Sequence, residues 1–293
     1  MAVYTKGGTE INEVFSVNGT SLSEAYDVYG YQVLEETPVE PDLVVMTYNY
    51  QWCDNINSQL AMQQAIISKY EPNIIGLQEA GTRQPGGFAS TFPAVATQFL
   101  SDYPYKVVSA TATNPNGIAS KIEYEDYEEV LLDSDGDDQY WDYQKCYITV
   151  KGKRIAWFNT HLTYKSDAVT KARKYRQATE LFNDAETEDY VIITGDFNMY
   201  GIGFDNAEYI GIGKQFADAG YNLSNWNNKV GFVKTWTSSA TATSLDNFSQ
   251  SCDNIITSPN IRIKRVVFDT TKFDYLNGRS IDHIPVIAYL VIN

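Results

Sequence analysis

The stretch YVIITGDFN, residues 190–198, carries the strongest structural signal in this chain. Its first part is apolar and rich in β-branched side chains, which is typical of a buried strand. Asp196 and Asn198 follow directly where that strand ends. A carboxylate is poorly suited to a buried strand end unless it is paired or bound to a metal. The stretch therefore predicts a strand that leads into a polar site.

The same arrangement recurs at other strands predicted along the chain. The polar residues at their ends are Asn49 after LVVMTY (43–48), Glu79 after NIIGLQ (73–78), His161 after RIAWFNT (154–160), Asp253 at the start of DNIITS (253–258), and Asp282 and His283 before PVIAYLVI (285–292). Each of them alone would ordinarily be a turn or capping residue. The chain has two histidines, and both belong to this set. Together the positions predict one polar patch assembled from distant segments.

The order of the predicted elements indicates the class of fold. Residues 56–70 predict a helix, because Ile56, Leu60, Ile67 and Tyr70 share one face, and Pro72 ends it. This helix joins the strands at 43–48 and 73–78 into a β-α-β unit, so both strands can lie in one sheet. A second helix is predicted over 167–185. Further strands are predicted at 105–110, 117–120 and 146–150. The chain thus has many predicted strands with few helices between them, which indicates an α+β or layered sandwich fold.

Composition limits the kinds of partner. The 293 residues are 43% hydrophobic and 14% aromatic, enough for a large core. A net charge of −15 disfavours a broad basic groove for nucleic acid, although a small site that binds phosphate through a metal ion remains compatible with it. No segment is apolar for long enough to cross a bilayer, and no signal peptide is visible. The three widely spaced cysteines, at positions 53, 146 and 252, predict free thiols.

The first 41 residues differ from the rest. VFSVNGTSL (14–22) and AYDVYGYQV (25–33) each alternate apolar positions around a glycine, which is a hairpin signal. EETPVEPD (35–42) is typical of a linker. We therefore expect a short β-rich N-terminal appendage and linker over residues 1–41 and a body over residues 42–293. A flexible or strand-swapped leader is the alternative interpretation.

Six motifs in the body carry a family resemblance. TYN (47–49), LQE (77–79), NTHL (159–162), GDFN (195–198), DNIITS (253–258) and IDHIPV (281–286) resemble, in order and spacing, the motifs of the endonuclease/exonuclease/phosphatase superfamily, the DNase I-like fold. The resemblance extends from about residue 43 to residue 293. It implies an α+β protein with a four-layered α/β/β/α sandwich. It also implies hydrolysis of a phosphate ester assisted by a divalent metal.

The resemblance implies metal ligands among these motifs. Glu79 would be the principal metal carboxylate, with Asn49 and Asp282 beside it. Oxygen ligands of this kind suit Mg²⁺ or Mn²⁺ and disfavour zinc.

The resemblance also implies catalytic roles. His283, oriented by Asp253, would act on the attacking water or hold the phosphate, and Asp196 is the competing candidate for the base. Asn198 would position the phosphate. His161 would protonate the leaving group or stabilise the charge that develops on the phosphorus centre.

Three further residues are candidate substrate contacts. Asn116, in NPNGIASK (114–121), stands where DNase I-type members carry a carboxylate that orients the first histidine. Lys145 stands before CYITV, where an arginine is often found. Arg83 belongs to a Gly/Pro-rich loop, GTRQPGG (81–87), directly after the metal glutamate.

Three functions remain open on sequence alone. The first is a metal-dependent nuclease that cleaves DNA or RNA phosphodiesters. The second is a phosphatase or phosphodiesterase of small or lipid phosphate esters, and the third is a non-catalytic virion structural protein that retains the fold. Residues 1–41 resemble N-terminal segments of bacteriophage tail or minor structural proteins that carry enzymatic domains. That resemblance favours the nuclease, attached to a phage particle through residues 1–41 and found in the cytoplasm or the virion.

Overall fold

The computed structural model describes residues 40–50, 56–80, 100–110, 112, 115–134, 140–164, 167–237, 248–270 and 282–293, together with six two-residue strands nearer the start of the chain. Those short strands form three antiparallel pairs: β1 (Val3–Tyr4) with β2 (Glu10–Ile11), β3 (Ser16–Val17) with β4 (Thr20–Ser21), and β5 (Ala25–Tyr26) with β6 (Gln32–Val33). The second and third pairs fall within the two predicted hairpin segments. The division of the chain at residue 41 stays a prediction.

The first large sheet contains the predicted β-α-β unit. Its strand order is β17 (Ile261–Phe268), β18 (Val286–Ile292), β7 (Leu43–Asn49), β8 (Ile74–Gln78), β10 (Gly117–Ser120) and β9 (Tyr105–Val108). β7 and β8 are parallel neighbours, joined by helix α1 (Ile56–Tyr70). The other pairs in this sheet are antiparallel, so the sheet is mixed.

The second large sheet is also mixed. Its order is β11 (Tyr124–Leu131), β12 (Asp142–Val150), β13 (Lys153–His161), β14 (Val191–Asp196), β16 (Asp253–Thr257) and β15 (Asn222–Leu223). β13 and β14 are its one parallel pair among the described strands, and helix α3 (Ala168–Ala185) connects them. Asp167 begins α3, where its side chain accepts hydrogen bonds from the backbone N–H groups of residues 169 and 170. Two short helices follow β14, α4 (Ala207–Ile212) and α5 (Lys214–Asp218).

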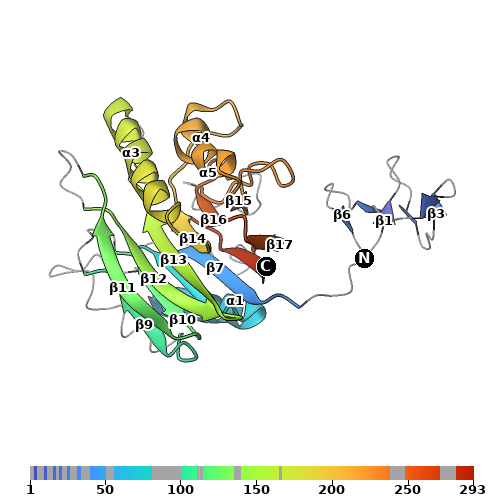
Figure 1. Ribbon diagram of the computed structural model, residues 1–293, viewed down its shortest axis with the longest axis horizontal. Helices are drawn as coiled ribbons and strands as arrows, with labels where there is room; N and C mark the ends of the chain where they lie inside the picture. Colours follow the sequence, from blue (N-terminus) through green and yellow to red (C-terminus); the bar gives the residue numbers. More distant parts are fainter. Residues whose placement is uncertain are drawn as a thin grey trace.

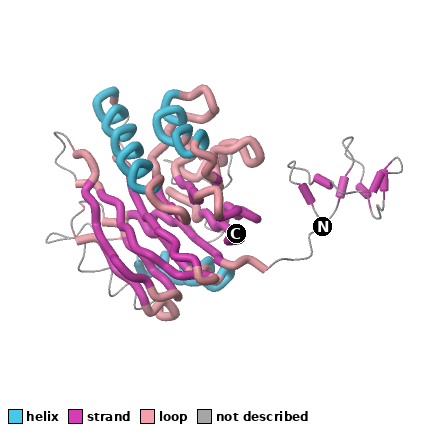
Figure 2. The backbone as a smooth tube through the Cα atoms, in the orientation of Figure 1, coloured by secondary structure: helices cyan, strands magenta, loops and turns pink. Residues whose placement is uncertain are grey.

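Helices cover the outer faces of the two packed sheets. Figure 1 shows α3, α4 and α5 together on one side and α1 on the other, and Figure 2 shows the strands between them. Side chains alternate accordingly: Val45 of β7 and Trp157 of β13 pack between the sheets, whereas Met46 packs toward α1 and Phe158 toward α3. This arrangement confirms the predicted α+β, four-layered sandwich. None of the helices that the structure describes is long and apolar enough to span a membrane.

The two sheets approach most closely near the end of β8. A Cβ atom at Gly76 would overlap Oγ1 of Thr194 and Oδ1 of Asn159, so only glycine permits this contact. Two residues further on, Nε2 of Gln78 donates to Oδ1 of Asn159 at 2.7 Å, from one sheet to the other. The close approach brings the ends of β8, β13 and β14 to one edge of the sandwich.

Candidate functional site

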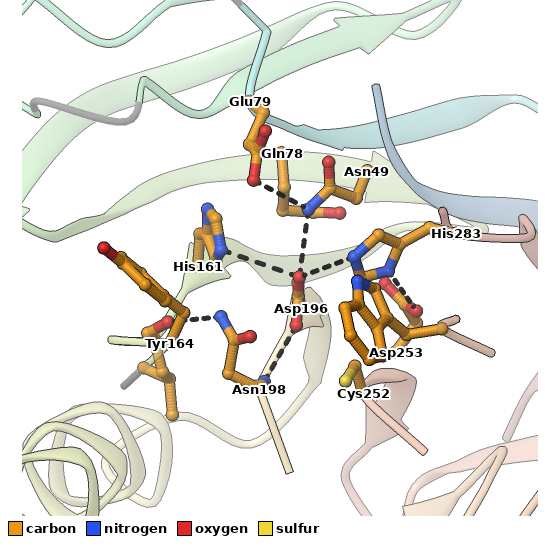
Figure 3. Close-up of polar contacts among 12 residues, drawn as sticks. Asn49, Gln78, Glu79, His161, Tyr164, Asp196, Asn198, Cys252, Asp253 and His283 are labelled. Carbon is orange, nitrogen blue, oxygen red and sulfur yellow. Dashed lines mark hydrogen bonds and ion pairs between the residues drawn. The ribbon is translucent and has the colours of Figure 1, made fainter. Parts of the chain in front are cut away.

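Five strands deliver polar side chains to that edge. In the second sheet the register places His161, Asp196 and Asp253 side by side on β13, β14 and β16. In the first sheet Asn49, the last residue of β7, pairs with Gln78, and Glu79 follows at once. Figure 3 shows these side chains facing one another across the gap between the sheets, with His283 beside them.

The amide of Asn49 connects the two sheets. Its Nδ2 atom donates to Oδ2 of Asp196 at 2.9 Å and to Oε1 of Glu79 at 3.5 Å. Asn49 is 1% exposed, so both hydrogen bonds are shielded from water. One amide therefore holds two carboxylates that come from opposite sheets.

Asp196 lies at the centre of the site. Its Oδ2 atom is 3.5 Å from Nε2 of His161 and 3.5 Å from Nε2 of His283, and its Oδ1 atom accepts from the backbone N–H of Asn198 at 2.8 Å. Burial raises the pKa of Asp196 to about 6, even though the charge of His283 lowers it and the carboxylate of Asp253 raises it further. The pKa of Asp196 is thus close to neutral pH, as a general base requires.

Asn198 turns the chain away from Asp196. Its φ is 49°, in the left-handed region that asparagine tolerates better than most residues. Its Nδ2 atom donates to the carbonyl oxygen of Leu162 at 2.7 Å, which ties the GDFN loop to the end of β13. One N–H of the amide remains for a substrate oxygen.

His283 lies between two aspartates. Its Nδ1 atom is 2.8 Å from Oδ2 of Asp253, and Asp196 is on the other side of the ring. Burial alone would lower the pKa of His283, but the carboxylates of Asp253 and Asp196 raise it to about 10. At neutral pH this histidine is therefore an imidazolium.

His161 has the opposite electrostatic character. It is 2% exposed, and its Nδ1 atom has no hydrogen-bond partner in the described part of the chain. Burial, and then the charge of His283, lowers the pKa of His161 to about 3. At neutral pH it is therefore a neutral imidazole with a single N–H to donate.

Several carboxylate oxygens suit a hard cation. Oε2 of Glu79, Oδ1 of Asp282 and Oδ1 of Asp253 are buried and have no hydrogen-bond partner among the described residues. Burial, followed by the charge of Asp282, raises the pKa of Glu79 to about 8. A divalent cation would stabilise these oxygens as anions, so the donor set fits Mg²⁺ or Mn²⁺.

The cation has two possible groups of ligands. The sequence places it on Glu79, Asn49 and Asp282. A second group, Asp196, Asp253 and His283, offers ligand atoms that all lie within 4.8 Å of one another. We favour the first group, because Oε2 of Glu79 and Oδ1 of Asp282 have no hydrogen-bond partner among the described residues, whereas His283 contacts both aspartates of the second group.

Two residues that the sequence reasoning missed support the site. Nε1 of Trp236 donates to Oδ2 of Asp282 at 3.0 Å, and the backbones of Trp236 and His283 form a β-bridge. Lys174 of α3 is fully buried and donates from Nζ to the carbonyl oxygen of Asn198 at 2.6 Å. No sequence signal identified Lys174, because a lysine adds nothing to the apolar periodicity of the helix, and its burial on the face of residues 170, 178 and 181 is seen only in the structure.

Asn116 reaches the same edge but makes a different contact from the one expected. It precedes β10, opposite Gln78, and its Nδ2 atom donates to Oδ1 of Asp142 at 2.6 Å. Burial raises the pKa of Asp142 to about 7, although hydrogen bonds from Ser109 and Asn116 lower it. Asn116 is therefore bound to a buried acid in the second sheet.

Lys145 is the one described candidate that lies outside the site. It is on β12, where odd-numbered positions face α3, and its Nζ atom is 2.8 Å from Asp184 and 3.3 Å from Glu188. Its amine is thus held on the outer face of the sheet, so the expected phosphate contact is wrong for this residue. Arg83 lies outside the described residues, as does Ile281.

Comparisons with known proteins agree with this architecture. Residues 54–271 match the model of the Endonuclease/Exonuclease/phosphatase family. No curated protein sequence matches the chain.

Solved structures with the same fold are distant in sequence. A Bacteroides vulgatus endonuclease/exonuclease/phosphatase aligns with a TM-score of 0.66 and 16% identity, over 86% of this chain and 99% of its own. The 3′ phosphatase NExo from Neisseria, bound to a product DNA hairpin, aligns with a TM-score of 0.64 and 21% identity, over 86% of this chain and 99% of its own. D. rerio TDP2, complexed with a single-strand DNA product, aligns with a TM-score of 0.65 and 16% identity, over 85% of this chain and 98% of its own.

These likenesses establish the fold, and the family match includes four of the six motifs, at 77–79, 159–162, 195–198 and 253–258. Members of the family are hydrolases of phosphate esters and generally depend on a divalent metal. The family and the enzyme class predicted from the sequence are confirmed. This chain belongs to the endonuclease/exonuclease/phosphatase family.

Proposed function

We propose that this chain is a divalent-metal-dependent nuclease that hydrolyses phosphodiesters of DNA or RNA by attack of water. The observation that carries the proposal is the position of Asp196, whose Oδ2 atom lies 3.5 Å from Nε2 of both His161 and His283. A carboxylate with a pKa near 6, beside one charged and one neutral imidazole, provides a base and two kinds of hydrogen-bond donor in one cavity.

Each side chain then has a role that follows from its protonation state. Asp196 accepts the proton of the attacking water. The imidazolium of His283 donates to a phosphoryl oxygen and stabilises its negative charge. His161, as a neutral imidazole, donates one hydrogen bond, which favours charge stabilisation over protonation of the leaving group.

The proposed metal ligands lie next to these catalytic groups, since Asn49 contacts both Asp196 and Glu79. Glu79, Asn49 and Asp282 would hold Mg²⁺ or Mn²⁺. When bound there, the cation polarises a phosphoryl oxygen and offsets charge on the departing oxygen.

Nucleic acid as the substrate is supported by two structural relatives. NExo is bound to a product DNA hairpin, and TDP2 is complexed with a single-strand DNA product. The net charge of −15 disfavours tight binding of long duplexes, so we expect short or single-stranded nucleic acid to be cleaved best.

A phosphatase is the second candidate, because NExo is described as a 3′ phosphatase and because the acidic surface suits a small substrate. The test uses 5′-labelled single-stranded oligonucleotides, with and without a 3′ phosphate, in Mg²⁺ or Mn²⁺. Shortened products support the nuclease. Release of inorganic phosphate without shortening supports the phosphatase, and turnover of only non-nucleotide esters rejects the nuclease.

Attachment to a phage particle through residues 1–41 remains a proposal based on sequence resemblance. Copurification of the full chain, but not of residues 42–293, with intact particles would test it.

A further inference from the structure

Aromatic side chains lie directly beside His161. The ring of Trp141 packs edge-on against the imidazole, with centroids 5.0 Å apart and an interplanar angle of 82°. The ring of Tyr164 lies 6.0 Å from Trp141, inclined at 60°. None of the catalytic roles above uses either aromatic side chain.

The two rings differ in exposure. Trp141 is 1% exposed, whereas Tyr164 is 42% exposed. Trp141 is thus a fixed support, and Tyr164 presents its ring to solvent at the rim of the site. A single exposed tyrosine is ordinary on a protein surface, so what distinguishes Tyr164 is its contact with Trp141, which packs against His161.

The backbone that carries Tyr164 is anchored to the catalytic loop. The hydroxyl of Tyr200 donates to the carbonyl oxygen of Tyr164, and Nδ2 of Asn198 donates to the carbonyl of Leu162. Figure 3 shows Tyr164 next to Asn198 and His161. The backbone that carries the ring is therefore held close to the proposed phosphate site, which lowers the entropy lost when a ligand stacks on the ring.

A second observation points to a ligand here. Nε1 of Trp141 is buried and has no hydrogen-bond acceptor among the residues that the structure describes. A buried donor without an acceptor is costly, so such groups ordinarily have a partner that is absent from the protein alone. A ligand with a flat π-face can stack on Tyr164, the exposed ring of the pair.

We infer that Tyr164, supported by Trp141, is a stacking site for one nucleobase of the substrate. The base belongs to the nucleoside on the side of the phosphate that His161 contacts. Stacking provides affinity that does not depend on cationic side chains, which suits a chain of net charge −15. The inference rests on the proposed function. Such a stacking site selects substrates in which this base is not stacked on neighbouring bases.

The experiment uses two dinucleotides, each with one phosphodiester. In each dinucleotide one nucleoside has 2-aminopurine as its base, and stacking quenches the fluorescence of this base. The other nucleoside is replaced by an abasic tetrahydrofuran. The two dinucleotides are isomers: 2-aminopurine lies on the 5′ side of the phosphate in one and on the 3′ side in the other. Both are titrated with the Asp196→Asn variant of the full chain in Mg²⁺, so that substrate binds without rapid turnover.

We expect quenching with one isomer only. Addition of Tyr164→Ala should abolish that quenching and weaken binding by about 5-fold to 150-fold, the range typical of one base on one aromatic ring. Tyr164→Phe keeps the π-face and should retain both the quenching and the binding affinity. Phe204→Ala is the matched control, because Phe204 is 43% exposed but contacts Tyr209 and Phe232 instead of site residues.

Two results would overturn the inference and differ from failure of the proposed function. Quenching that persists in Tyr164→Ala would show that the base lies elsewhere. A fully abasic dinucleotide that wild-type protein hydrolyses as efficiently as one with bases would show that no base is recognised, while nuclease chemistry stands. If wild-type protein hydrolyses no dinucleotide but cleaves glycerophosphocholine, the proposed function itself is wrong.

Discussion

The Nδ1 atom of His283 lies 2.8 Å from Oδ2 of Asp253. This contact, with Asp196 on the other side of the ring, keeps His283 protonated until about pH 10. A permanent imidazolium is suited to holding a phosphate, whereas a base must be able to accept a proton. In the proposed mechanism this contact favours Asp196 as the base, one of the two alternatives that the sequence left open.

Replacing Asp253 by asparagine should shift the pH dependence of hydrolysis. Asp253→Asn removes one carboxylate that raises the pKa of His283, so that pKa should fall by roughly 1–3 units. Because His283 acts while protonated, activity at alkaline pH is lost first. We expect the basic limb of the kcat/KM profile, measured from pH 5 to 10, to move to lower pH. An unchanged limb, with wild-type far-UV circular dichroism, would contradict the role of His283.

Glu79→Gln should stabilise the metal-free protein. The pKa of Glu79 is about 8 in the folded state, whereas a glutamate in water titrates near 4.5, so folding is penalised progressively as pH rises from about 4.5 to 8. The variant removes this penalty, and we expect Tm at pH 8 to rise by roughly 2–4 °C, with little change at pH 4.5. Mg²⁺ should raise the Tm of wild-type protein more than that of the variant. Equal responses to Mg²⁺ would exclude Glu79 as a ligand.

Lys145→Gln should affect stability and leave substrate binding unchanged. The amine pairs with Asp184 and Glu188 on the outer face of the sheet, and its loss leaves two partly buried carboxylates without their cation. We expect a loss of about 1–2 kcal/mol in the free energy of unfolding by urea. Lys214→Gln removes an exposed pair with Asp218 and should change stability by less than about 0.5 kcal/mol. A raised KM in Lys145→Gln would restore Lys145 as a substrate contact.

Lys174→Met should lower the rate more than the stability. Burial lowers the pKa of Lys174, so an apolar side chain of similar length removes an unfavourable buried charge. The carbonyl of Asn198 loses its donor, however, and the GDFN loop loses its support from α3. We expect kcat to fall by roughly tenfold or more with Tm nearly unchanged. Full kcat in a folded variant would show that Lys174 has no positioning role.

Much of the fold was accessible from local patterns. The strands at 43–49 and 191–196 are buried on both faces and form continuous apolar runs, so their sequence alone predicts them. β11 and β17 were missed because they are edge strands of mostly exposed and half-buried residues, with charges at several positions. α4 and α5 were missed because each is too short to show helical periodicity.

The residues of the candidate site could be predicted from the sequence, whereas only some of the contacts between them could. Polar residues at strand ends identified Asn49, Glu79 and His161, because the same pattern recurred at several strands, although each residue alone could have been a turn or capping residue. Whether the side chain of Lys145 points between the sheets or toward α3 depends on which face of β12 it lies on. A single sequence does not reveal this. The role of Trp236 was equally hidden, since its partner Asp282 is 46 residues away along the chain.

The most direct test of the account is the rate at which a single-stranded oligonucleotide is cleaved in Mg²⁺ by wild-type protein and by Asp196→Asn at equal concentrations. Asp196 is the only residue that contacts Asn49, His161 and His283 among the described contacts, so its carboxylate should be indispensable. We expect wild-type protein to cleave the oligonucleotide in a reaction that EDTA abolishes, and the folded variant to cleave it at a rate lower by about 10³-fold or more. Equal cleavage by both proteins, or cleavage unaffected by EDTA, would contradict it.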